Sequence, residues 1–147
     1  MTDDQAAPKV LIRERAECAL STYLGRRVDR PDLPEVLTEF LGEAMDLAAF
    51  MNADFHLILG RAYLFSTGAR IIPIWPDDER PLADLGVAPQ TTAARAIDGF
   101  VASGGANGVP QCFSAALAKL MACLVELADQ CGANFEVCLL DAYKKRP

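Results

Sequence analysis

Four carboxylates along residues 35–46 are the best candidates for chemistry in this sequence. The row consists of Glu35, Glu39, Glu43 and Asp46, separated by four, four and three residues. Side chains at this spacing stack along one face of an α-helix. Clustered carboxylate oxygens are the ligands that Mg²⁺ prefers, so Glu39, Glu43 and Asp46 form a candidate metal site. The alternative interpretation is the solvated acidic face of an amphipathic helix, which is the commoner use of such a row.

Part of this row resembles a known enzyme family. The stretch Gly42-Glu43-Ala44-Met45-Asp46-Leu47-Ala48 is similar to the GExxELAE-type helix of the MazG-like all-α nucleoside triphosphate pyrophosphatases. Residues 124–140, followed by Lys144-Lys145-Arg146, resemble that family's later helix, its break and its final helix, so the pattern covers about 50 of 147 residues. The resemblance implies a bundle that dimerises or tetramerises and hydrolyses nucleoside triphosphates to monophosphate and pyrophosphate with Mg²⁺. Glu43 and Asp46 would then be metal ligands.

The later helix departs from the family where its own metal-binding acids should lie. The matching positions are Ala115, Ala116 and Lys119, and the third acid of the early helix falls at Ala49. Alanine and lysine cannot replace carboxylates as Mg²⁺ ligands. If Glu126 and Asp129 are taken as the acid pair instead, the later helix does carry two carboxylates. Gly132 would then end that helix directly after the pair, which does not fit the family pattern. Half of the metal cage is missing, which fits a degenerate relative or a coincidence of helical spacing.

Other polar residues give weaker indications. His56 is the only histidine, and its apolar neighbours favour a partly buried side chain over a general base. The loop from Gly104 to Gly108 lacks the GxxxxGK[ST] pattern, which favours a hinge over a phosphate cradle. Trp75, between two prolines, packs on the core or anchors a partner. Four arginines could meet an anionic ligand, although solvated or ion-paired arginines are commoner. They are Arg61, Arg70, Arg80 and Arg95.

Composition narrows the class of protein. Twenty acidic and fourteen basic residues give a net charge of −6, which disfavours nucleic acid and anionic membranes as partners. Five cysteines without a CxxC pair indicate a reducing compartment and no zinc site. The N-terminus lacks a signal-peptide pattern, so we expect a cytoplasmic protein. The apolar stretch from Ala44 to Phe65 contains charged residues and is expected to be a core segment, not a membrane span.

Apolar periodicity and capping residues predict an all-α fold, a single helical domain over residues 1–147 with about five to six helices. The expected helices cover residues 10–24, 33–51, 55–65, 91–101, 110–130 and 135–143. We expect Asp32 and Glu35 to form a capping box, Asn52 or Asp54 to cap the third helix, Thr91 or Thr92 the fourth, and Asn134 the last. Residues 70–75 should be extended and residues 1–8 a disordered tail. The sequence shows no obvious internal repeat.

The helix predicted over residues 110–130 is apolar almost all round. Such a helix is either central in its bundle or lies in a subunit interface. We therefore expect a non-catalytic helical protein that forms a homo-oligomer or binds a protein partner. The alternative is a Mg²⁺-dependent nucleotide pyrophosphohydrolase, with a nucleotide as ligand.

Overall fold

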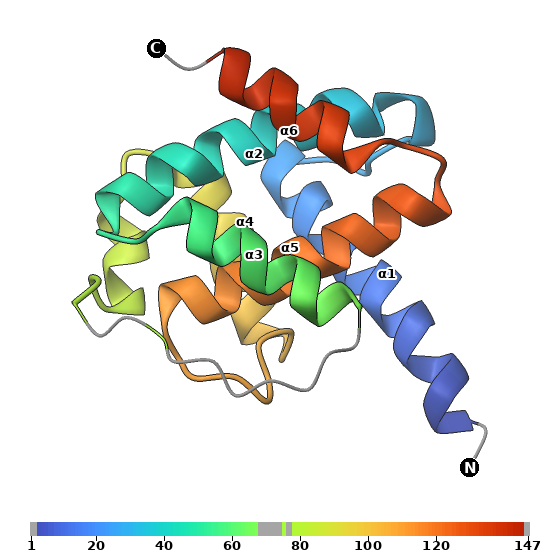
Figure 1. Ribbon diagram of the computed structural model, residues 1–147, viewed down its shortest axis with the longest axis horizontal. Coiled ribbons are helices and arrows are strands. Elements are labelled where there is room, and N and C mark those ends of the chain that lie inside the picture. Colours follow the sequence, from blue (N-terminus) through green and yellow to red (C-terminus); the bar gives the residue numbers. More distant parts are fainter. Residues whose placement is uncertain (1–2, 68–74, 76–77, 146–147) are drawn as a thin grey trace.

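The computed structural model describes residues 3–67, 75 and 78–145, with side chains from residue 12 onward (Figure 1). These residues form six α-helices and two short 3-10 helices, and they contain no strand. In chain order the elements are α1 (Asp3–Leu24), η1 (Arg30–Asp32), α2 (Leu33–Phe50), α3 (Phe55–Ser66), η2 (Leu82–Val87), α4 (Thr91–Ala102), α5 (Phe113–Gln130) and α6 (Phe135–Lys144). The predicted all-α bundle is confirmed. The predicted extended segment, residues 70–75, lies outside the described residues except for Trp75.

Helix α5 occupies the centre of the bundle. It packs most extensively against α3 and α1, and it also contacts α4 and α6 (Figure 1). Thirteen of its 18 residues are buried, many of them alanines that let neighbouring backbones approach closely. The all-round apolar character of this helix is therefore satisfied within one chain. Between the two interpretations that the sequence left open, the structure selects the central one.

Two helices begin at the predicted caps. The Asp54 side chain accepts hydrogen bonds from the backbone N–H groups of His56 and Leu57, at 3.0 and 3.2 Å. The Asn134 side chain accepts one from the N–H of Val137 at 3.1 Å. Each cap satisfies amide groups that the first turn of a helix leaves without a partner. The α2–α3 and α5–α6 boundaries follow from these local interactions.

Other expectations about helix starts are wrong. Asp32 makes no capping hydrogen bond, because η1 runs directly into α2 and leaves Asp32 in a helical conformation. Its carboxylate lies 3.7 Å from the Arg26 guanidinium instead. Neither Thr91 nor Thr92 caps α4, whose N-cap position is Gln90. Helix α1 begins at Asp3, so it includes residues 3–8, which we expected to be a tail.

The two halves of the chain have similar structures, a repeat that residue identity in the sequence does not show. Helices α2 and α5 both contain 18 residues, and both are followed by a residue with positive φ: Asn52 (58°) and Gly132 (74°). In each case the next residue, Ala53 or Ala133, donates a 2.8 Å hydrogen bond to the carbonyl five residues earlier. This is the same helix-ending motif, followed each time by the capping residue of a shorter helix.

Packing between the halves follows an approximate two-fold symmetry. Helix α3 of the first half packs along α5, and α6 of the second half packs along α2. Two equivalent edge-to-face aromatic pairs join α3 to α6. Phe55 and Tyr143 have ring centroids 6.4 Å apart, and Tyr63 and Phe135 have centroids 6.3 Å apart, both at 85°. Each half therefore covers the long helix of the other with its own last helix.

Helices α1 and α4 occupy corresponding places in the two halves and pack on each other, although α1 packs extensively on α5 whereas α4 contacts α2 only weakly. Their buried residues share one spacing and similar size. In α1 these are Ala16, Ala19, Leu20 and Tyr23, and in α4 the residues at the same spacing are Ala93, Ala96, Ile97 and Phe100, with Ala94 buried in addition. The repeat unit is thus a three-helix segment, α1–α3 or α4–α6.

Each half of the molecule has a cleft at one end, and the two clefts differ in whether a chain segment covers them. Residues 78–88 close the cleft between α4, the end of α2 and the start of α5. There the Glu79 carboxylate accepts hydrogen bonds from the N–H and hydroxyl of Ser114, at 2.9 and 2.6 Å. The N–H of Arg80 donates to the carbonyl of Met51 at 2.9 Å, and Leu85 is buried. The described residues leave the equivalent cleft, between α1, the end of α5 and the start of α2, open.

The apolar stretch of residues 44–65 is divided between α2 and α3. Within the described part of the chain, none of the helices has the length and apolar character needed to cross a membrane.

Candidate functional site

The predicted metal ligands lie on the outer side of α2. Glu35 and Glu39 are exposed, as is Asp46, whereas Glu43 is half-buried. Among the described residues, no three Asp, Glu, His or Cys side chains come close enough to hold a metal ion. The proposed site at Glu39, Glu43 and Asp46 therefore gains no support from a second group of ligands, and it stays a prediction.

Glu43 joins three helices. One carboxylate oxygen accepts a hydrogen bond from the hydroxyl of Tyr23 on α1. The other accepts one from the hydroxyl of Thr92 on α4, at 2.9 Å. Both oxygens of this half-buried carboxylate are thus engaged by neutral donors, which is how a polar group is accommodated away from water. This arrangement makes Glu43 a link between α1, α2 and α4.

The positions that would carry the family's second set of acids lie in or beside the core. Ala115 and Ala116 are buried in α5, and the Lys119 ammonium lies 5.4 Å from the centroid of the Phe65 ring. Helix α2 packs chiefly on α6, while α5 packs chiefly on α3 and α1. Helices α2 and α5, which would carry the family's two sets of acids, are therefore not each other's principal neighbours, and the hydrogen bonds of Glu43 are to α1 and α4.

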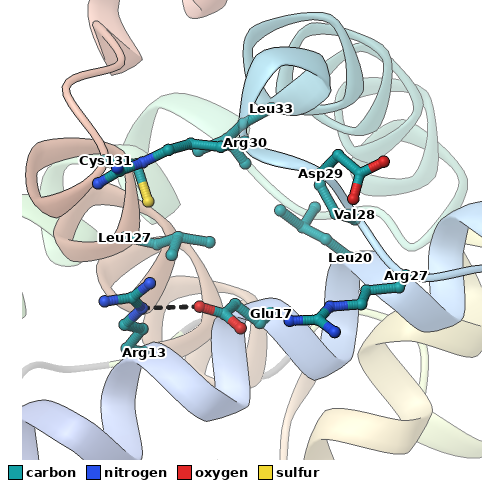
Figure 2. Close-up of a pocket in the computed structure, with 10 residues that line it drawn as sticks. All are labelled: Arg13, Glu17, Leu20, Arg27, Val28, Asp29, Arg30, Leu33, Leu127 and Cys131. Atoms are coloured by element: carbon teal, nitrogen blue, oxygen red, sulfur yellow. Dashed lines mark hydrogen bonds and ion pairs between the residues drawn. The ribbon is translucent and has the colours of Figure 1, made fainter.

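An open pocket of about 460 Å³ occupies the uncovered cleft (Figure 2). Its apolar floor consists of Leu20, Leu33 and Leu127, all buried, and Cys131 lies at its edge. Its charged lining consists of Arg13, Arg27, Arg30, Glu17 and Asp29. Pockets of this size, with an apolar floor and a few polar groups, are typical binding sites. Three guanidinium groups against two carboxylates give the lining an excess of positive charge, although the chain as a whole is acidic.

The three arginines differ in their interactions. Arg13 forms a 2.7 Å ion pair with Glu17, and this hydrogen bond raises the pKa of the Arg13 guanidinium. Arg30 donates a 3.3 Å hydrogen bond to the carbonyl of Gln130, at the C-terminal end of α5. Figure 2 shows Arg27 extending along the opposite side of the pocket. Arg27 and Arg30 are both exposed, so an anionic group entering from solvent can reach them.

The arginines considered from the sequence do not form one site. Arg61 lies 5.9 Å from the ring of Trp75, and Arg80 lies 4.4 Å from the ring of Phe50. Arg95 lines a different hollow beside η2, and Arg70 is outside the described residues. The arginines of the pocket are not among the candidates that the sequence suggests. The cluster at residues 26, 27 and 30 was the available signal.

The remaining candidates have structural contacts. His56 is exposed and stacks on Tyr143, with ring centroids 5.9 Å apart and Nδ1 3.4 Å from the hydroxyl. Trp75 stacks against Phe65 at 6.3 Å, as expected for a residue packed on the core. All five cysteines are free. Burial raises the pKa of the Cys123 thiol to about 11, which makes this thiol unreactive at neutral pH.

Comparisons with known protein families, curated proteins and solved structures give no match.

Proposed function

We propose that this protein is non-catalytic and self-associates through the outward face of α6. The observation that carries the proposal is the exposure of two large apolar side chains one turn apart, Val137 (50%) and Leu140 (57%). Among the described residues, the other exposed large apolar side chains are Leu64 and Val87, which belong to other elements. Figure 1 shows α6 along the upper edge of the molecule, beside α2.

Charges on α6 fit a second copy of the same helix. Glu136 lies in its first turn and Lys144 in its last, each four residues from Leu140. If two α6 helices pack antiparallel about a two-fold axis near Leu140, Glu136 of each copy faces Lys144 of the other. Self-complementarity of this kind is what a two-fold interface requires. The antiparallel orientation also pairs helix dipoles favourably.

The test is the mass of the protein in solution, measured by light scattering after size-exclusion chromatography at about 10–100 µM, where interfaces of ordinary size are occupied. We expect a dimer, and we expect L140D to be monomeric with unchanged circular dichroism. The matched control is V87D, which adds the same charge at an exposed apolar residue elsewhere and should remain dimeric.

Charge reversal tests the register. E136K should weaken the dimer because it places a second positive charge opposite Lys144, and E136K/K144E should restore it. A wild-type chain that is monomeric at the highest of these concentrations, or a dimer unaffected by L140D, would overturn the proposal.

The alternative, a Mg²⁺-dependent nucleoside triphosphate pyrophosphatase, is supported by the resemblance of residues 42–48 and 124–140 to that family. It predicts pyrophosphate release from one of a panel of triphosphates with Mg²⁺ or Mn²⁺, and loss of that release in E43Q. E35Q, at the exposed end of the same row, is the matched control. No pyrophosphate from any triphosphate would remove this alternative.

A further inference from the structure

The approximate two-fold symmetry relates the open pocket to the cleft covered by residues 78–88. Equivalent helices line both clefts, so the floors correspond residue by residue. Leu20, Leu33, Leu127 and Cys131 of the open pocket correspond to Ile97, Phe113, Leu47 and Met51 of the covered cleft. Two of the four residues in the open pocket are clearly smaller, which leaves more room. The covered cleft thus shows what a chain segment does when it occupies this type of groove.

Residues 78–88 occupy the covered cleft with three kinds of contact. The Glu79 carboxylate binds donors at the start of α5, on Ser114. The backbone N–H of Arg80 binds the carbonyl of Met51 just beyond the end of α2. The apolar side chain of Leu85 is buried, and η2 packs on α4. An acidic residue, a backbone donor and a leucine are therefore the features that fit this groove.

The open pocket presents partners for two of these features, the leucine and the acid. Its leucine floor can accept an apolar side chain. In the open pocket, Pro34 occupies the position that Ser114 occupies in the covered cleft. Proline has neither a backbone N–H nor a hydroxyl to donate. Arg27 and Arg30 supply donors in this cleft instead, and a guanidinium binds a carboxylate with two parallel hydrogen bonds. The acids of an incoming segment would thus meet arginine side chains, whereas Glu79 meets the start of a helix.

We propose that the open pocket binds an acidic, leucine-containing peptide segment of a partner protein, in the way that residues 78–88 cover the equivalent cleft. Carboxylates of the partner pair with Arg27 on one side of the pocket and with Arg30 on the other, and its leucine lies on Leu20, Leu33 and Leu127. This surface is separate from the outward face of α6, so the proposal does not depend on self-association.

The probe is a fluorescein-labelled peptide with the sequence of residues 78–88, DERPLADLGVA, titrated with the full chain and followed by fluorescence anisotropy. We expect saturable binding that weakens as salt rises, because charged groups contribute to it. R27E and R30E should each weaken binding at least tenfold. R95E, a similarly exposed arginine on a different face, is the matched control and should leave binding unchanged.

The position of binding is tested with the thiol at the pocket edge. Saturating peptide should slow alkylation of Cys131, read by mass spectrometry, while leaving exposed Cys18 unaffected. Peptides carrying L85D or E79K should neither bind the chain nor protect Cys131 from alkylation.

Three results would overturn the proposal: no saturable binding, binding indifferent to both R27E and R30E, or binding without protection of Cys131. Binding of sodium octanoate or inorganic phosphate at Arg27, without binding of the peptide, would also overturn it and would indicate a small-anion site.

Discussion

The open pocket and the covered cleft are built from equivalent helices, yet one holds arginines around a cavity and the other is part of the core. In the covered cleft, Leu85 of the segment 78–88 is buried and Glu79 binds the first turn of the central helix. In the open pocket the equivalent surface keeps Arg27 and Arg30 in solvent. The difference shows that the same three-helix scaffold becomes core or site depending on whether a chain segment covers it.

Truncating a leucine to alanine should cost more stability in the floor of the covered cleft than in the floor of the open pocket. L47A removes side-chain volume beneath a covering segment and leaves a cavity, so we expect it to destabilise the protein by about 2–5 kcal/mol. L127A opens onto a pocket that water can enter, so we expect a loss of roughly half as much, from reduced apolar burial. Urea unfolding monitored by circular dichroism measures both. Equal losses would contradict the distinction between the two clefts.

The covering segment should stabilise its cleft through Glu79. E79A removes both hydrogen bonds to Ser114, a buried residue at the start of α5, and we expect a loss of about 1–2 kcal/mol. D78A, at the adjacent exposed residue, is the control and should change stability by less than about 0.5 kcal/mol. A loss from D78A as large as that from E79A would show that the Glu79 carboxylate is not the cause.

The halves should also differ at high pH. Cys123 of α5 corresponds to Glu43 of α2, and burial raises its pKa from 9.0 to about 11. Between these values only the unfolded thiol ionises, so stability that is fully present below pH 9 falls as the pH rises toward 11. At a pH of about 10 we expect a loss of about 1 kcal/mol relative to a pH of about 8. C123A should lack this component, which denaturant unfolding at the two pH values will reveal.

The smallest effect is expected on the outer face of α3. Gly60 occupies the position that corresponds to Leu140 of α6, and a Cβ there would meet no atom within 4 Å. G60A should therefore stabilise the protein by about 0.5–1 kcal/mol, because alanine favours a helix over glycine. G105A is the opposing case, since its Cβ would lie 2.5 Å from the Phe100 ring, and it should destabilise. A thermal melt distinguishes the two.

Much of the fold could be predicted from the sequence, because helix starts and stops depend on local interactions. Asp54 and Asn134 cap the amides nearest to them, and Gly132 supplies the positive φ that ends α5. The capping box at Asp32 failed because a preceding 3-10 turn changed the backbone at that residue. The repeat is not evident in the sequence, because the two halves share their burial pattern and turn geometry more than their residue identities.

The candidate sites also depend partly on local sequence and partly on tertiary packing. The sequence placed Glu35, Glu39, Glu43 and Asp46 on one helix face, but it could not show that Tyr23 and Thr92 bind Glu43. No single segment of the sequence contains the pocket, since its lining comes from α1, the start of α2 and the end of α5. Metal binding by this row of carboxylates stays a prediction.

By itself, the sequence determined an all-α chain, the main helix boundaries and an α5 helix without a polar face. Periodicity and capping act over a few residues, so these features are encoded locally. Only the tertiary structure decided that α5 is central, that the two halves are related by an approximate two-fold symmetry, and that the described residues leave one of two equivalent clefts open. Those outcomes depend on which helices pack together, and apolar periodicity specifies that a face is buried without specifying its partner.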